Sequence, residues 1–313
     1  MILHYAMERV KSGRALCLAA VELFLVWAGV SAAAPLQEKR FVFVSPGYNN
    51  APWARKFLES VFAQDYKNYH IILIDDASTD NAVAVIEACI TEHKRWDQVT
   101  FMKNKKRIGM LANRYRAIYQ CQDTDIVVML DADDWLLPGR ADILSFYNKL
   151  YDDSVVWMTY GQHVTHPAGA LGNAAPPDPA HLSGVDMRTR WFAYTHLRTF
   201  YAWLFKLIKT QDLMWPAQRR FIPILTDLAI IYPIVEMCGT AHARFVSEPV
   251  CVYNLENPLT GHFRRNRLLA QASFAKIMSV KPYPALSCAP PLPLSSNEFV
   301  SCDWDALPEA FAA

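Results

Sequence analysis

Apolar and amphipathic segments alternate regularly along the first half of the chain. Short runs rich in apolar and β-branched residues predict strands within residues 40–50, 69–80, 98–104 and 124–131. Segments with apolar side chains at helical spacing predict intervening helices at residues 52–64, 81–96 and 110–121. Strands that alternate with helices are typical of a mostly parallel sheet covered on both faces, so the pattern predicts an α/β fold.

The pattern is less regular after this region. It predicts a helix at 140–153, a strand at 154–162, a helix at 224–239 and a strand at 243–254. We expect Pro233 to kink the helix that contains it.

Two further segments differ in composition. Residues 166–184 are rich in Pro, Gly and Ala and predict a loop. Residues 188–208 are rich in aromatics, and helical core spacing is found at Phe200, Trp203, Leu204 and Leu207. We therefore expect one main domain in two halves, residues 37–160 and 161–280, followed by a Pro-rich tail at 281–313.

The N-terminal segment has the order of a secretory signal. Basic residues within 7–14 precede an apolar run at 15–30, and small residues follow near Ala32–Ala34. Counted through Ala34, the run also suits a membrane anchor, and a non-functional extension is the alternative. We expect residues 1–36 to be signal-like or anchoring. Association with a membrane through residues 15–34, at the cytoplasmic face or in a secretory lumen, is favoured over a freely cytoplasmic protein.

Charge and cysteine content exclude several classes of protein. The formal net charge is +1, from 31 basic and 30 acidic residues, which gives no reason to expect a nucleic acid as partner. The seven cysteines include no CxxC pair, which excludes a zinc knuckle and argues against a dense disulfide scaffold. Most cysteines are expected to be small buried side chains.

Carboxylates gather where predicted strands end. The motifs "SPGYNN", "IDDASTD" and "LDADDW" all follow strands, and ligands of open α/β sheets bind beyond such carboxyl ends. One edge should therefore carry Tyr48, Asp75, Asp76, Asp131, Asp133 and Asp134. Repulsion among these carboxylates is relieved by a divalent cation, and oxygen ligands favour Mg²⁺ or Mn²⁺ with substrate phosphates. Phosphate charge could be balanced by the basic loop of Lys103, Lys105, Lys106 and Arg107.

Other interpretations explain less. A helix N-cap suits Asp134, but it does not explain all three carboxylates together with the pair at 75–76. The chain has neither GxGxxG at the first turn nor GxxxxGK[ST], so Rossmann dinucleotide and P-loop sites lose their main support.

The ordered motifs resemble those of family 2 glycosyltransferases of GT-A fold. They are "FVFVSPGYNN", "IILIDDASTDN", "NKKRIGMLANRYRAI" and "DIVVMLDADDWLLP", and the match is close over residues 40–160 and looser to about 275. The resemblance implies a nucleotide-diphosphate-sugar donor, such as a UDP- or GDP-sugar, and inversion at the anomeric carbon.

The resemblance also implies roles for particular residues. Pro46, Tyr48 and Asp76 would hold the base and ribose, with Arg107 on the donor side. Asp131-Ala132-Asp133 matches the DxD motif. Asp133 is then the first candidate for the metal, Mn²⁺ or Mg²⁺, with Asp131 facing the ribose or the metal shell. Asp134 could share the metal role.

The candidate catalytic base is Asp227. It lies in "LTDLAI", which matches the family's later "ED"-like motif, with Thr226 where Glu is common. An inverting transfer needs one carboxylate to accept the proton of the acceptor hydroxyl, while metal and basic groups stabilise the departing diphosphate. A simple helix N-cap is the alternative for Asp227.

Several residues are weaker candidates. Arg198 and the aromatics around it could line an acceptor site, although a core position is favoured for most of the aromatics. His262 with Arg264 or Arg265 could close over the diphosphate, or form a solvated basic face. Glu236 and His242 are expected to be structural.

The sequence thus predicts an inverting, metal-assisted glycosyltransferase acting on a glycan, lipid or protein hydroxyl. One alternative is a nucleotidyltransferase, but "SPGYNN" lacks the basic residues its activation loop would need. The other is a sugar- or nucleotide-binding protein that has lost catalysis. Donor sugar, acceptor, oligomeric state, disulfide pairing and cleavage of the N-terminal segment stay open.

Overall fold

An eight-stranded sheet, in the order β3-β2-β1-β4-β7-β6-β10-β5, forms the centre of the computed structural model. Its strands are β1 (Phe41–Gly47), β2 (Tyr69–Asp75), β3 (Val99–Lys103), β4 (Ile126–Met129), β5 (Trp135–Leu136), β6 (Met158–His166), β7 (Arg198–Tyr201) and β10 (Ala243–Asn254). Strands β3, β2, β1 and β4 run parallel to one another, whereas β7 runs antiparallel to both β4 and β6. The predicted mostly parallel α/β sheet is confirmed.

The structure describes residues 37–176, 187–189, 192–215, 220–259 and 266–294. The α-helices are α2 (Ala51–Phe62), α3 (Ala82–His93), α4 (Met110–Ile118), α5 (Ile143–Leu150), α7 (Ala202–Lys206), α8 (Thr226–His242) and α10 (Arg267–Ser279). Short 3₁₀ turns η1 (Met187–Thr189) and η2 (Thr210–Leu213) and a small pair of strands, β8 (Met214–Trp215) and β9 (Arg220–Phe221), complete the elements.

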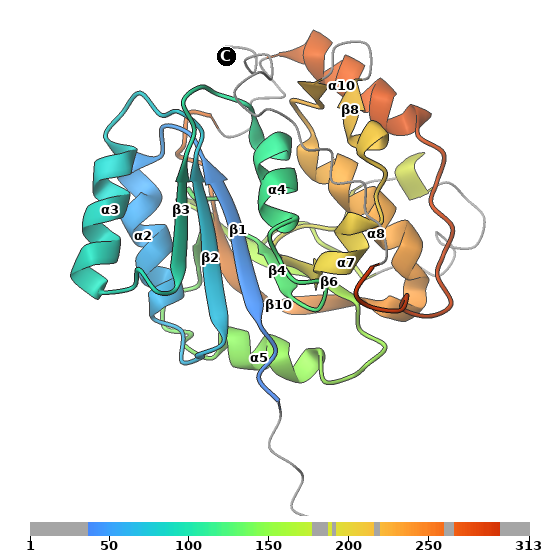
Figure 1. Ribbon diagram of the computed structural model, residues 1–313, viewed down its shortest axis with the longest axis horizontal. Coiled ribbons are helices and arrows are strands. Elements are labelled where there is room, and N and C mark those ends of the chain that lie inside the picture. Colours follow the sequence, from blue (N-terminus) through green and yellow to red (C-terminus); the bar gives the residue numbers. More distant parts are fainter. Residues whose placement is uncertain (1–36, 177–186, 190–191, 216–219, 260–265, 295–313) are drawn as a thin grey trace, which may run out of the picture. The chain divides into compact units, whose positions relative to one another are not determined.

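Both faces of the sheet are covered by helices, and alternate strand residues point to different cores (Figure 1). Phe41 and Phe43 of β1 belong to the core that contains residues of α2, α3 and α5. Val42 and Val44 belong to the opposite core, with residues of α4, α7 and α8. Burial on both faces explains why the strands read as continuous apolar runs rather than as alternating patterns.

The aromatic-rich segment does not form the one continuous helix that the spacing of its apolar residues predicts. Residues Arg198–Tyr201 form β7, and Phe200 lies opposite Val127 of β4, so the helical interpretation is wrong at Phe200. A helix begins only at Ala202 and includes Trp203 and Leu204. The core interpretation is confirmed for Phe200, Trp203 and Leu204, which are buried. Sheet pairing with β4 overrides the local periodicity here.

Helix α8 contains Pro233, yet its backbone leaves helical geometry at Gly239, with φ 55° and ψ −161°. A bend of the helix axis at Pro233 itself stays a prediction. A positive φ is the conformation that glycine adopts without the steric cost of a Cβ atom, so the break falls at Gly239.

The cysteine prediction is confirmed where the structure describes it. Cys89, Cys121, Cys238 and Cys251 are buried and free, and Cys288 is exposed and free. Within the described ranges, no helix combines the length and apolar character that crossing a membrane requires. The predicted signal or anchor at residues 1–36 lies outside the described residues, as does the tail from residue 295 onward.

Buried His163 on β6 makes the stability of the fold depend on pH. Its side chain is shielded from water, and this burial, followed by the charge of Arg198, lowers its pKa to about 4. Between the unfolded value of about 6.5 and this native value, the unfolded chain binds a proton that the native protein does not. The free energy of unfolding therefore falls as the pH decreases through this window, with a contribution from His163 of about 2–3 kcal/mol.

Urea unfolding at several pH values between about 7 and 4 tests this contribution. We expect His163→Gln to lose less stability than the unmodified protein on acidification. His166→Gln, at a partly exposed position of the same strand, is the matched control and should keep the original slope. Equal slopes for the His163→Gln and unmodified proteins would contradict the assignment.

Candidate active site

A pocket of about 430 Å³ opens where β1 and β4, two adjacent parallel strands, reach their carboxyl ends. This is the position at which open α/β sheets bind ligands. Of the residues expected at this edge, Pro46, Tyr48, Asp76, Arg107, Asp131, Asp133 and Asp227 line the pocket, whereas Asp75 and Asp134 do not. One cavity thus joins residues that are more than half the chain apart in sequence.

One end of the pocket has a flat, stacked surface. The Arg107 guanidinium lies over the Tyr48 ring at 4.0 Å from its centroid. Asp76 accepts hydrogen bonds of 2.9 Å from the backbone N–H groups of Ile108 and Gly109, and one of 2.9 Å from Asn104. Asp76 therefore organises the loop that carries Arg107.

The turn that holds the DxD motif is packed against the end of β1. A Cβ atom on Gly47 would lie only 3.0 Å from the Cβ of Ala132, so glycine is needed for this close approach. Asn50 donates a 2.9 Å hydrogen bond from Nδ2 to the carbonyl oxygen of Ala132. The "SPGYNN" motif therefore supports the turn as well as lining the pocket, a role of Asn50 that the sequence did not reveal.

Each of the three carboxylates of this turn has a different partner. Arg114 of α4 pairs with Asp131, and Asn257 donates a 2.6 Å hydrogen bond from Nδ2 to Asp133. Buried Asp134 accepts a 2.8 Å hydrogen bond from the backbone N–H of Asn254.

Asp134 ties the turn to the end of β10. The residues that follow it form the short strand β5, so the interpretation of Asp134 as a helix N-cap is wrong. The sequence could not show this because the strand partner of β5 lies more than 100 residues further on, in β10.

Two of the carboxylates, Asp133 and Asp134, have raised pKa values. Burial, and then the charge of Asp131, raises the pKa of Asp133 to about 6. Burial together with the charges of Asp133 and Asp131 raises the pKa of Asp134 well above its usual value. A cation bound here would relieve both the repulsion and the desolvation.

The side chains present fit a divalent metal ion. Donor atoms of Asp131, Asp134 and His196 all lie within 4.8 Å of one another. Two buried atoms of this set, Asp134 Oδ2 and His196 Nδ1, have no hydrogen-bond partner among the residues that the structure describes. Burial and the neighbouring Arg198 lower the pKa of His196 well below its usual value, which keeps the imidazole in the neutral form that binds metals. Asp133, the first candidate from the sequence, lines the same pocket beside this set.

Sequence reasoning missed His196, and only strand pairing reveals it. In the antiparallel pair of β4 and β7, Met129 lies opposite Arg198. Continuing that register by two residues brings His196 opposite Asp131. No local spacing signals a partner 65 residues away, because antiparallel register is set by the whole sheet.

Asp227, which also lines the pocket, lies in the first turn of α8. Arg198 Nη2 lies 3.2 Å from its carboxylate, which holds that side chain in place. The N-cap position of α8 belongs to Leu225, so the N-cap interpretation of Asp227 is wrong. Arg198, a weaker candidate from the sequence, is thus part of the pocket wall.

Arg114 links the DxD turn to the start of α8. Besides its pairing with Asp131, it donates a 3.2 Å hydrogen bond from Nη1 to Thr226 Oγ1. Thr226 stands where the family commonly has Glu, and here its hydroxyl accepts a hydrogen bond from the buried guanidinium of Arg114. The sequence contained Arg114 within a recognised motif but gave no sign of this bridge.

The remaining candidates fall outside the pocket or outside the described residues. Lys103 pairs with Glu87 at 2.8 Å on the surface, and Lys105 and Lys106 do not line the pocket. Structural roles are confirmed for Glu236, paired with buried Arg188 at 2.6 Å, and for His242, whose ring stacks on Trp157. His262, Arg264 and Arg265 lie in the undescribed stretch 260–265.

Curated relatives are glycosyltransferases matched over part of the chain. An uncharacterized glycosyltransferase of Rickettsia felis is 30% identical over 108 residues, which cover 34% of this chain and 17% of that protein. The uncharacterized glycosyltransferase YibD of Escherichia coli is 23% identical over 229 residues, 71% of this chain and 63% of that protein. The chain spans a third or less of the length of the first curated relatives it matches.

Solved structures show the same fold. The crystal structure of S. aureus TarS 1–349 in complex with UDP superposes with a TM-score of 0.54 at 14% identity, covering 77% of this chain and 66% of that one. The complex of the same protein with UDP-GlcNAc has a TM-score of 0.52 at 13% identity, with 77% and 67% covered.

The family model described as Glycosyl transferase family 2 matches residues 43–206, more than half of the 313 residues. This range begins in β1 and ends in α7, so it contains the donor-side loops, the DxD turn and His196. The chain belongs to glycosyl transferase family 2.

Proposed function

We propose that this protein transfers a sugar from a nucleotide-diphosphate sugar to an acceptor hydroxyl, with inversion and with the help of a divalent metal ion. The observation that carries the proposal is that one pocket unites a stacked aromatic surface, the DxD carboxylates and the separate carboxylate of Asp227. An enzyme for this reaction needs a surface for the nucleotide, a metal site and a base close enough together to contact one bound donor and its acceptor.

The nucleotide binds at the Tyr48 and Arg107 end. An aromatic ring backed by a guanidinium offers a flat surface for a base, and Asp76 holds the surrounding loop in place. The TarS complexes with UDP and UDP-GlcNAc support a uridine donor for a chain of the same fold. A GDP-sugar is the alternative donor for the same surface.

The diphosphate lies beside the DxD turn. Asp131 and Asp133 of the motif, with Asp134 and His196 behind them, would hold Mn²⁺ or Mg²⁺. Such an ion neutralises the charge that develops on the departing diphosphate. The imidazole in this set favours Mn²⁺ over Mg²⁺, because Mg²⁺ prefers oxygen ligands.

Asp227 accepts the proton of the acceptor hydroxyl. It lines the same pocket as the DxD carboxylates but comes from a separate element, α8, so the sugar would lie between the departing diphosphate and the attacking oxygen. Attack from the side opposite the diphosphate gives inversion, and a single carboxylate base is sufficient for that step. Arg198 fixes the position of this base.

The acceptor is a glycan, lipid or protein hydroxyl, and we propose that the enzyme works at a membrane through residues 15–34. The apolar run in this segment supports membrane association. Cell fractionation with N-terminal sequencing of the mature protein tests it. We expect the protein in the membrane fraction, and a soluble mature protein that begins near residue 36 would contradict an anchor.

Thermal unfolding with a panel of UDP- and GDP-sugars, with and without Mn²⁺, tests the donor and the metal. A bound donor at about 100 times its dissociation constant stabilises the native state by about 2.7 kcal/mol. We expect this stabilisation to require Mn²⁺ and to be lost in Asp133→Asn.

The Asp133→Asn variant should fold at least as well as the unmodified protein without ligand, because it removes a repelled carboxylate. Loss of the ligand effect in this variant is therefore not loss of the fold. Asp152→Asn, at an exposed carboxylate, is the matched control and should keep the full response. Metal-dependent stabilisation that survives in Asp133→Asn would overturn the metal role of Asp133.

The catalytic base is tested with Asp227→Asn. General-base catalysis contributes about 10²–10⁴-fold, so we expect turnover with the best donor to fall by that factor. Stabilisation by donor and Mn²⁺ should be unchanged, because Asp227 contacts neither the nucleotide surface nor the DxD turn. Unchanged turnover would remove Asp227 from the mechanism, whereas loss of donor binding would place it on the donor side.

A further inference from the structure

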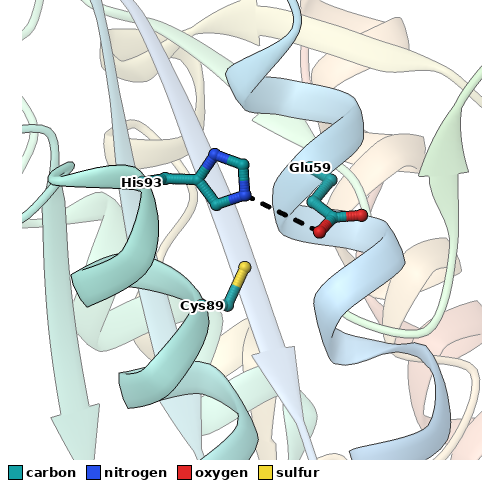
Figure 2. Close-up of side chains that lie close together, drawn as sticks. All are labelled: Glu59, Cys89 and His93. Atoms are coloured by element: carbon teal, nitrogen blue, oxygen red, sulfur yellow. Dashed lines mark ion pairs between the residues drawn. The ribbon is translucent and has the colours of Figure 1, made fainter.

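A second group of metal-binding side chains lies between helices α2 and α3. Glu59 of α2 and Cys89 and His93 of α3 point into one space between the helices (Figure 2). Their donor atoms all lie within 4.8 Å of one another, and His93 Nε2 lies 3.6 Å from Glu59 Oε1. None of the three lines the active-site pocket.

The helical spacing explains this convergence. Cys89 and His93 are four residues apart, so they lie one turn apart on the same face of α3. Helix α2 packs against that face and presents Glu59 to it. Four-residue spacing on a helix is a common way to place two ligands on one metal ion.

The distances suit a small tetrahedral ion. Ligand bonds of about 2.0–2.3 Å to zinc place neighbouring donor atoms about 3.3–3.7 Å apart. The separation of 3.6 Å between His93 and Glu59 already falls in this range. Closing the remaining distances takes side-chain movements of about 1 Å, which the exposed Glu59 and His93 can make.

The surroundings leave the donors available. Cys89 is fully buried and forms the floor of the space, whereas the side chains of His93 and Glu59 are 39% and 45% exposed. Arg55 contacts Glu59 Oε1 at 3.2 Å, but it has a closer partner in Glu92 at 2.6 Å. Arg55 can therefore remain paired with Glu92 when the carboxylate of Glu59 turns toward an ion. The Phe62 ring packs against His93 and restricts the imidazole.

We propose that Glu59, Cys89 and His93 form a Zn²⁺ site, with water as the fourth ligand. A thiolate, an imidazole and a carboxylate are the donor set of zinc, whereas the carboxylate-rich active site suits Mn²⁺ or Mg²⁺. Binding displaces the thiol proton of Cys89, which passes to solvent.

The site would act as a cross-link between two helices. Helix α2 follows the "SPGYNN" loop and α3 follows the "IDDASTD" loop, both of which end strands at the active-site edge. An ion that joins α2 to α3 stabilises the native state because the complete site exists only in the folded chain. The inference does not depend on the proposed transferase activity.

Cobalt(II) titration of the full chain tests the site directly. Excess Mn²⁺ is present throughout so that the proposed active-site metal position is occupied. We expect one equivalent of Co²⁺ to produce a thiolate-to-cobalt charge-transfer band and intense visible bands of tetrahedral geometry, and Zn²⁺ to abolish both. Cys89→Ser should remove the charge-transfer band, and Cys238→Ser, at another buried free thiol, should keep it.

His93→Gln gives a second variant at an exposed position, where folding is not at risk. Because it removes a direct ligand, we expect Zn²⁺ affinity to fall by more than the roughly 10–100-fold that loss of an outer partner costs. Zn²⁺ should raise the melting temperature of the unmodified and Cys238→Ser proteins but not of His93→Gln. Absence of the charge-transfer band, its persistence in Cys89→Ser, or equal zinc stabilisation of His93→Gln would each overturn the proposal.

Discussion

Three neighbouring carboxylates at the end of a buried strand are the constraint on which the rest of this structure depends. Asp131, Asp133 and Asp134 follow β4, and burial disfavours the charged forms of Asp133 and Asp134. Each is compensated by a group from a distant part of the chain: Arg114 of α4, Asn257 beyond β10, and the Asn254 backbone at the end of β10. Satisfying these carboxylates therefore fixes the position of α4 and β10 around the pocket.

The antiparallel strand β7 completes the arrangement. It lies between β4 and β6 and brings His196 and Arg198 to the pocket from a segment that is rich in core aromatics. Arg198 pairs with Asp227 at the start of α8, while Arg114 joins Asp131 to Thr226. Two buried arginines thus link the DxD turn and β7 to the first turn of α8. In the transfer proposed above, these links would hold the donor and acceptor groups at a set separation.

Helices α2 and α3 pack against the sheet, and the loops that precede them lie at the same edge. The loops that precede these helices hold Tyr48 and Asp76, so the positions of the helices affect the shape of the pocket at its proposed donor end. Ion pairs from Arg55 and His93 join the helices at the surface. Exposed pairs contribute little to stability, and a metal ion at the same place would contribute far more.

The sequence by itself determined the α/β class, the strands that end at the active-site edge, and several residues of the pocket. This was possible because local periodicity reports burial, and because parallel strands bring their carboxyl ends together. Pro46, Tyr48, Asp76, Asp131, Asp133 and Asp227 could therefore be placed in one site. Only the tertiary structure decided the roles of His196, Arg114 and Asn257, the tether formed by Asp134, and the strand conformation of Phe200. These depend on pairing between segments 60 to 130 residues apart, and long-range register is set by the packing of the whole sheet rather than by local residue spacing.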